Sequence, residues 1–219
     1  MLESVTVIGA GRVGSAIAAR LREREVDVRP SGGALVLLCV PDSAIAEVAA
    51  SLEPGPWVAH FSGATPLAAL DPHVRRFSMH PLQTFTRRRG PEQLDGAWAA
   101  VTGEDEAASE QGFRLARLLG FQPFALADDA RPLYHAGAAI ASNYLVTLHR
   151  AASTLFLRAG APPEGLEPLM RRTIENDFEL TGPIARGDWS TVDAHLDALA
   201  GQAPELVPLY RALAEATAP

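Results

Sequence analysis

The start of the chain combines a strand, a glycine-rich turn and a helix, and this combination constrains the fold more than any other feature. Residues 4–8 are β-branched and mostly apolar, which is typical of a buried parallel strand. Residues 15–25 place apolar side chains at helical spacing. Between them, residues 9–14 read Gly-Ala-Gly-Arg-Val-Gly. The order strand, turn, helix predicts a parallel α/β unit at this end of the chain.

The three glycines have the spacing of a Rossmann-type dinucleotide turn. The first allows a tight turn, the second lets a pyrophosphate approach the backbone, and the third lets the helix pack closely on the strand. The free N–H groups at the start of the helix favour an anion. A packing turn inherited from a binding ancestor is the alternative. The predicted cofactor contacts in this turn are Gly9, Ala10, Gly11, Arg12, Val13 and Gly14.

The next segment departs from the usual dinucleotide pattern. It ends Val28-Arg29-Pro30-Ser31 and lacks the acidic residue that binds the ribose of NAD. Arg29 and Ser31 would suit a 2′-phosphate, which favours NADP over NAD, with a solvated arginine as the alternative. Only residues 31–33 precede the next apolar strand, too few for an ordinary parallel crossover. We therefore expect residues 26–29 to form an irregular or antiparallel edge, a shortened adenosine wall and weak cofactor binding.

Beyond this point the chain completes an α/β domain and then becomes helical throughout. The predicted fold class is α/β plus all-α, with a Rossmann-like NAD(P)-binding domain at residues 1–129 and a helical domain at 130–219. Further strands are predicted at 34–40, 57–61, 76–79, 97–102 and 122–126, with helices at 44–52, 106–119, 132–159, 163–180, 191–200 and 204–216.

Composition excludes several kinds of chemistry. All 19 basic residues are arginine, so no lysine can act as an acid, a base or a Schiff-base nucleophile. The net charge of −7 argues against nucleic acid or an anionic membrane as the main partner. Cys39 is the only cysteine, and no Cys/His spacing suggests a metal site. Without a signal peptide or a long apolar run, a cytoplasmic protein is expected.

Histidine is the natural proton donor in a chain without lysine. His80 precedes Pro81 in a loop predicted after a short strand, and such loops lie at the carboxyl edge of a sheet, where ligands bind. His135 lies early in the long helix, with Asn143 two turns further along nearly the same face. The alternatives are a His-Pro turn packed for shape and a histidine bonded to a backbone carbonyl. We predict that His80 or His135 supplies the proton and that Asn143 orients the substrate.

Other polar segments are weaker candidates. Ser62 and Gly63 end a predicted strand, where a nicotinamide or a substrate could lie, or where there is only a turn. Val40 and Pro41 end another strand and are also predicted to contact the cofactor. The triple arginine at residues 87–89 could hold a phosphate or a carboxylate, or could be solvated.

Four segments together resemble a known family. These are Cys39-Val40-Pro41-Asp42, residues 60–64, residues 80–85 and residues 134–143. With the glycine turn, they are similar to proteins that join a Rossmann-like domain to the helical domain of unknown function 2520. These proteins are related to pyrroline-5-carboxylate reductase, ketopantoate reductase and the 6-phosphogluconate dehydrogenase group. The resemblance implies an NAD(P) cofactor. It does not carry over the lysine of hydroxyacid dehydrogenases, whose position is Ala139 here.

Three functions follow as hypotheses. The first is an NADP-dependent oxidoreductase that reduces a small 2-oxo acid or imine at a site between the sheet edge and the long helix. The second, from the His-Pro pair, is an enzyme similar to prephenate dehydrogenase. The third is a non-catalytic binding or regulatory protein on a degenerate scaffold. The alanine- and leucine-rich long helix also predicts a homodimer, with a monomer whose later helices cover that face as the alternative.

Overall fold

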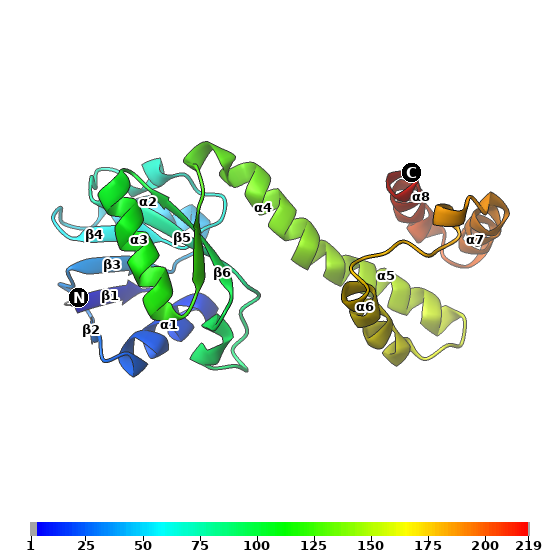
Figure 1. Ribbon diagram of the computed structural model, residues 1–219, viewed down its shortest axis with the longest axis horizontal. Coiled ribbons are helices and arrows are strands. Elements are labelled where there is room, and N and C mark those ends of the chain that lie inside the picture. The colour runs from blue at the N-terminus through cyan, green and yellow to red at the C-terminus, as the bar shows by residue number, and fades with distance from the viewer. Residues whose placement is uncertain (1–3, 219) are drawn as a thin grey trace. The chain divides into compact units, whose positions relative to one another are not determined.

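The computed structural model describes residues 4–218, which fall into two compact units (Figure 1). The first runs to Ile140 and the second starts at Ala141. The division between compact units therefore comes later in the chain than the domain boundary predicted at residues 129 and 130. The helix predicted at 132–159 is divided between the two units: its residues up to 140 belong, by their contacts, to the first unit and those from 141 to the second.

Within residues 4–218, the first unit holds one seven-stranded sheet. Its strands are β1 (Ser4–Ile8), β2 (Asp27–Arg29), β3 (Leu35–Leu38), β4 (Trp57–His60), β5 (Arg76–Leu82), β6 (Trp98–Gly103) and β7 (Gln122–Ala125). Its helices are α1 (Arg12–Glu23), α2 (Ile45–Ala50), α3 (Glu106–Leu119) and α4 (Arg131–Ala139). The strand order is β2-β1-β3-β4-β5-β6-β7, and only the β5–β6 pair is antiparallel. This is the predicted mostly parallel, Rossmann-type architecture.

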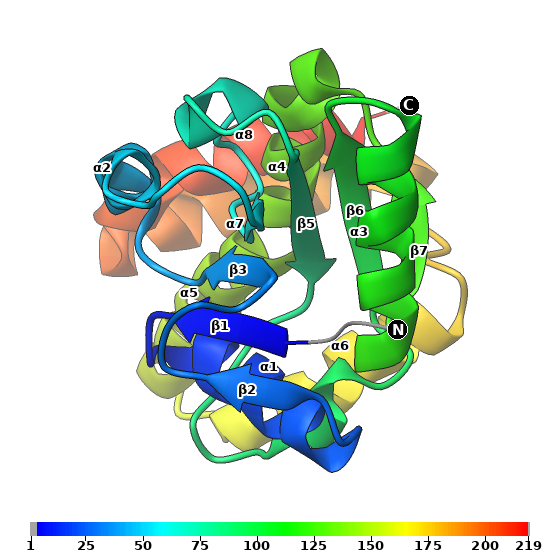
Figure 2. The same ribbon diagram turned by 90° about the vertical axis from the view of Figure 1, so that its left-hand side faces the viewer.

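Two hydrophobic cores lie on opposite faces of the sheet. Helices α1 and α3 cover one face, and α2 covers the other (Figure 2). Strand β3 shows the alternation, since Leu35 and Leu37 pack into the first core while Val36 and Leu38 pack into the second. Burial on both faces explains why this strand is an unbroken apolar run.

The segment before β3 is a correction to the prediction. Strand β2 pairs in parallel with β1, with Thr6 opposite Arg29, and is neither irregular nor antiparallel. The linker to β3 can be short because β2 ends opposite Thr6 and β3 begins opposite Val5. The chain therefore moves sideways across β1 and returns by only about one residue along the strands. It crosses directly over β1. The Gly33 amide donates to Thr6 Oγ1 at 3.1 Å, and a Cβ on Gly33 would lie 2.6 Å from the Thr6 nitrogen.

The second unit is all-helical, as predicted. It contains α5 (Leu145–Arg158), α6 (Leu166–Glu175), α7 (Trp189–Gln202) and α8 (Val207–Thr217). The predicted helix at 132–159 is interrupted by a π-helical turn at Ile140–Tyr144. The helix predicted at 163–180 is shorter because Asp177 and Phe178 both adopt positive φ, which ends helical geometry. Across residues 4–218, no helix is long and apolar enough to cross a membrane.

Candidate active site at the carboxyl edge of the sheet

The glycine turn has the geometry that the sequence predicts for the first and third glycines. Gly9 has φ of 109°, and a Cβ there would lie 2.4 Å from the Cys39 carbonyl oxygen. A Cβ on Gly14 would lie 2.0 Å from the Gly9 oxygen, so α1 and the turn touch directly. Gly11 differs, because a Cβ there would meet no atom within 4 Å. The backbone at Gly11 is therefore open on the side from which a pyrophosphate would approach, and these residues fit a dinucleotide.

The end of β2 is less favourable to a 2′-phosphate than the sequence suggests. Arg29 Nε lies 2.5 Å from Asp27 Oδ2, and both side chains are about half exposed. The guanidinium that was predicted to bind the phosphate is therefore already paired with a carboxylate. Ser31 is exposed. Whether these two residues contact a cofactor stays a prediction, as it does for Val40 and Pro41 at the end of β3.

A buried turn follows β4 at the same edge of the sheet as the glycine turn. The hydroxyl of Ser62 donates to Asp42 Oδ2 at 2.6 Å and accepts from the amides of Ala64 and Thr65 at 3.2 and 3.0 Å. These bonds occupy the hydroxyl within the chain and hold the turn in place. The Ser62 amide in turn donates to Nδ1 of His60, a fully buried side chain at the end of β4.

Gly63 of this turn lies against two histidines. A Cβ at this position would lie 2.5 Å from Cδ2 of His135 and 2.9 Å from Nε2 of His80. Only glycine leaves room for both rings, which gives a structural reason for the residue. The two predicted catalytic histidines are thus brought together at the carboxyl edge, with ring centroids 5.6 Å apart.

The position of His80 differs from the prediction in one respect. It lies within strand β5 rather than in a loop after it, because β5 continues through Pro81 to Leu82 in antiparallel pairing with β6. His60 at the end of β4 is opposite Ser78, so His80 still extends past the last residue of its parallel neighbour. It therefore stands at the edge where ligands bind in open α/β sheets.

Tyr134 completes the cluster. Its hydroxyl lies 2.8 Å from His80 Nδ1, a hydrogen bond in which either atom can donate, depending on the tautomer of the ring. The Tyr134 and His80 rings meet edge to face, with centroids 5.5 Å apart. Helix α4 thus presents consecutive residues, Tyr134 and His135, to the same histidine.

The site favours neutral side chains. Burial, the charge of nearby His135 and the charge of Arg131 lower the pKa of His80 to about 4, although Asp42 opposes the shift. Burial raises the pKa of Tyr134 to about 12. Burial and Arg131 lower the pKa of His60 to about 3. At neutral pH, His80 is therefore an uncharged imidazole hydrogen-bonded to an uncharged phenol.

Arg131, at the first position of α4, is a residue that the sequence analysis missed. Its side chain is fully buried and donates to the carbonyls of Ser62 and Thr65 at 2.6 and 2.8 Å. It also donates to the hydroxyls of Ser78 and Thr102 at 2.7 and 3.1 Å. The guanidinium therefore ties α4 to the turn after β4 and to β5 and β6, which fixes the two histidines against each other.

One sequence signal could have identified Arg131. A cation in the first turn of a helix opposes the helix dipole, so such a residue needs another partner. Asp128, whose carboxylate lies 3.6 Å from Arg131 Nε, is that partner within the chain and also accepts from the Leu67 amide. An arginine at this place, two residues after a pair of aspartates, marks a helix start that is held by buried polar contacts.

Asn143 belongs to the second unit, in its π-helical turn, and its side chain is exposed. Its predicted role in orienting a substrate stays a prediction. Among residues 4–218, no group of three or more His, Cys, Asp or Glu side chains could hold a metal ion.

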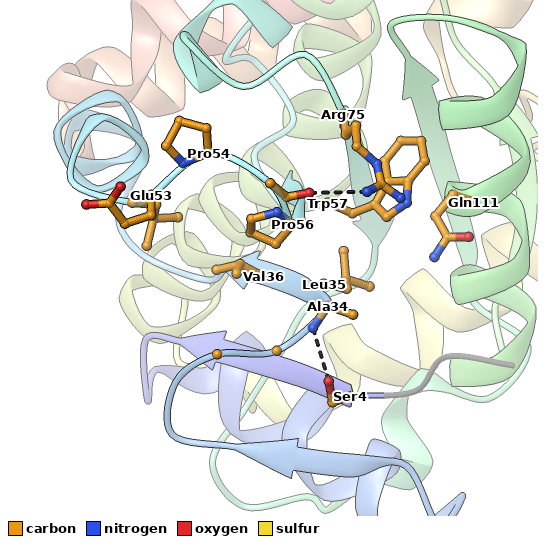
Figure 3. A pocket seen from close by; sticks show the side chains of 14 residues that line it. Ser4, Ala34, Leu35, Val36, Glu53, Pro54, Pro56, Trp57, Arg75 and Gln111 are labelled. Atoms are coloured by element: carbon orange, nitrogen blue, oxygen red, sulfur yellow. Dashed lines mark hydrogen bonds between the residues drawn. The ribbon is translucent and has the colours of Figure 1, made fainter.

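A separate cavity of about 910 Å³ lies at the opposite, amino edge of the sheet (Figure 3). Arg75 stacks over the Trp57 ring at 4.7 Å and donates to the Gly55 carbonyl, while the Ala34 amide donates to Ser4 Oγ. These contacts occupy Arg75 and Ser4 of the cavity wall. None of the predicted site residues lines it.

Several solved structures are similar to this chain. One, provisionally named an NADP oxidoreductase, from Bacteroides fragilis, has a TM-score of 0.80 at 20% identity, covering 98% of this chain and 97% of the other. A semialdehyde dehydrogenase NAD-binding protein from Cupriavidus necator, in complex with calcium and NAD, has a TM-score of 0.66 at 18% identity. The match covers 96% of this chain and 99% of the other. Prephenate dehydrogenase from Aquifex aeolicus, in complex with hydroxyphenyl propionate and NAD⁺, has a TM-score of 0.57 at 16% identity. The match covers 98% of this chain and 96% of the other.

At these identities the likeness shows the fold. No curated protein sequence matches the chain. A family match covers the sequence from β6 to α8 and includes residues 134–143, one of the segments that suggested the family. Residues 97–217 match the domain of unknown function DUF2520, more than half of the chain, and the protein therefore belongs to the DUF2520 family.

Proposed function

We propose that this protein is an NADP-dependent oxidoreductase that reduces a small 2-oxo acid or imine. The observation that carries the proposal is the cluster of His80, His135 and Tyr134 packed on Gly63, at the same sheet edge as the open backbone of Gly11. The fold is shared with structures that contain NAD, which supports a nicotinamide cofactor. A bound nicotinamide would supply the hydride.

His80 then supplies the proton from its neutral form. When Tyr134 donates its O–H to Nδ1, the remaining ring proton of His80 is on Nε2, the atom next to Gly63. Nε2–H donates to the oxygen or nitrogen of the substrate as negative charge develops there. Nδ1 takes the Tyr134 proton as Nε2 loses its own. Solvent then delivers a proton to Nε2, and the Nδ1 proton returns to the Tyr134 oxygen, which restores the starting state. The raised pKa of Tyr134 keeps its hydroxyl protonated before each turnover.

This mechanism predicts a pH profile that an imidazolium donor would not give. A histidine that donates from its charged form loses activity as the pH rises through its pKa. Because the pKa of His80 is lowered to about 4, the neutral ring is already the main form above that value. The rate should therefore stay level across neutral pH.

Arg131 acts on the reaction through His80 and His135. It is a positioning residue, because it holds α4 against the turn that carries Gly63.

A second candidate is a binding protein without turnover. The three-residue length of β2 and the pairing of Arg29 with Asp27 favour it, because both weaken the adenosine side of the site. The open glycine turn and the neutral histidine–tyrosine pair favour the enzyme. The enzyme binds and consumes a nicotinamide cofactor, whereas the second candidate consumes none.

The test begins with NADPH and NADH titrations of the full chain, followed by cofactor fluorescence. We expect NADPH to bind more tightly than NADH, and Gly11→Val to abolish binding, because the side chain would fill the approach to the backbone without meeting other protein atoms. Equal affinities would refute NADP preference, and an unaffected Gly11→Val variant would refute the dinucleotide site.

Turnover is then measured with a panel of 2-oxo acids and cyclic imines. His80→Asn should lower kcat about 10²–10⁴-fold, as expected for loss of a general acid, and leave cofactor affinity unchanged. Tyr134→Phe should retain binding and lower kcat, because the phenol returns the proton to His80. The assignment of His80 as proton donor is wrong if His80→Asn keeps wild-type turnover, and His135 takes its place if only His135→Asn loses it.

A further inference from the structure

A second polar cavity, of about 300 Å³, lies between the first two turns of α1 and the loop that joins β5 to β6. Arg12 and Ser15 line it from the helix. Arg87 and Arg89 line it from the loop, whereas the intervening Arg88 does not. Two of the three consecutive arginines in the sequence thus face one cavity together with the arginine of the glycine turn.

The loop that carries these arginines is held by a buried side chain. Gln93 is 2% exposed, and its Nε2 donates to the carbonyls of Arg89 and Gly90 at 3.0 and 2.9 Å. Its Oε1 accepts from the Thr86 amide at 3.0 Å. One side chain therefore closes the loop from residue 86 to residue 90 and fixes the backbone on which Arg87 and Arg89 stand.

The loop is also attached to the helix on the other side of the cavity. Arg20 of α1 is buried and donates to the Pro91 carbonyl at 2.8 Å, and its Nη2 lies 3.1 Å from Asp95. The two walls of the cavity are consequently joined by contacts that do not use Arg12, Arg87 or Arg89.

The positive charge of the cavity has no acidic partner within the described chain. None of the ion pairs found in residues 4–218 includes Arg12, Arg87 or Arg89. The nearby Glu92 accepts from the Gly90 amide instead. In a chain of net charge −7, three arginines that line one small cavity form a local site for an anion.

We propose that this arginine pocket binds a phosphate group. Guanidinium forks match the oxygens of phosphate in pairs, and the cavity adjoins the turn in which Gly11 is open to a pyrophosphate. On the function proposed above, the phosphate is one of the cofactor's own. It would then be Arg12, Arg87 and Arg89, rather than the paired Arg29, that hold the charge of the cofactor.

The pocket is tested with inorganic pyrophosphate by isothermal titration of the full chain at low ionic strength. Arg87→Gln and Arg89→Gln should each weaken binding about tenfold, as expected for loss of a hydrogen bond to a charged group. Arg88→Gln is the matched control, since it removes the same charge from the same loop without changing the cavity wall. Equal effects of the three variants, or no binding of pyrophosphate, would overturn the proposal.

The same variants identify the source of the phosphate. If Arg87→Gln and Arg89→Gln weaken NADPH as they weaken pyrophosphate, and pyrophosphate competes with NADPH, the pocket serves the cofactor. If they weaken pyrophosphate alone, the pocket is confirmed and its phosphate belongs to the substrate. A wild-type chain that binds pyrophosphate but not NADPH would refute the proposed function and leave the pocket standing.

Discussion

We expect His60 and His80 to make the first unit sensitive to mild acid. His60 is fully buried, and burial together with the charge of Arg131 lowers its pKa to about 3 in the folded protein. In the unfolded chain a histidine has a pKa of about 6.5. Its contribution to stability is therefore complete above pH 6.5 and is lost as the pH falls from there toward 3, because only the unfolded chain takes up the proton.

The size of this effect follows from proton linkage. Between pH 7 and pH 4.5, His60 becomes almost fully protonated in the unfolded state and takes up almost no proton in the folded state, which costs about 2.5 kcal/mol. His80, with a pKa of about 4, adds about 2 kcal/mol by the same reasoning. The sum of about 4–5 kcal/mol is comparable to the whole stability of a marginal domain of about 5 kcal/mol.

The assay is guanidinium unfolding at several pH values, followed by fluorescence of Trp57. A background with Trp98→Phe and Trp189→Phe leaves this tryptophan, at the start of β4, as the only indole. In His60→Asn the amide oxygen can accept from the Ser62 amide in place of Nδ1, so the turn keeps its bond.

The variant should reduce the slope of unfolding free energy against pH by about 1.2 kcal/mol per pH unit between pH 4.5 and 6. The slope is the quantity compared, because a general loss of stability lowers the unfolding free energy by the same amount at every pH. Identical slopes for His60→Asn and its parent would refute the reasoning.

Three further outcomes are expected. Gly14→Ala should destabilise the fold by at least about 1–3 kcal/mol, because its Cβ would lie 2.0 Å from the Gly9 oxygen, while Gly11→Ala, with no atom within 4 Å, should leave Tm unchanged; equal Tm values would contradict this. Arg131→Met should cost about 3–5 kcal/mol, because four buried acceptors lose their donor, and wild-type stability in denaturant titration would show that these bonds contribute little. Light scattering should give twice the 23.2 kDa of one chain, since none of the side chains of α5 is fully buried; a mass near 23 kDa would exclude the dimer.

The sequence by itself determined the features that depend on neighbouring residues. The strand, glycine turn and helix at the start of the chain need only local geometry, and β1 has the predicted bounds Ser4–Ile8. Helix α3 also has its predicted bounds, because Asp105 caps its start and Gly120, at φ of 98°, ends it. The change from α/β to all-helical pattern is equally visible from the order of elements.

Only the tertiary structure decided how distant segments meet. A sequence shows how many residues join two strands but not their register, so the short linker after β2 suggested an irregular edge. The register of β1, β2 and β3 shows that the linker needs to move only sideways, across the backbone at Gly33.

The candidate site divides in the same way. His80 and His135 were selected by residue type and position. Their contact through Gly63, and the lowered pKa of His80, arise from packing between β5, α4 and the turn after β4. Arg131 was missed because its acceptors come from segments far apart in the sequence. Burial and long-range hydrogen bonds are properties of the folded chain, and they determine which of its polar residues can act together.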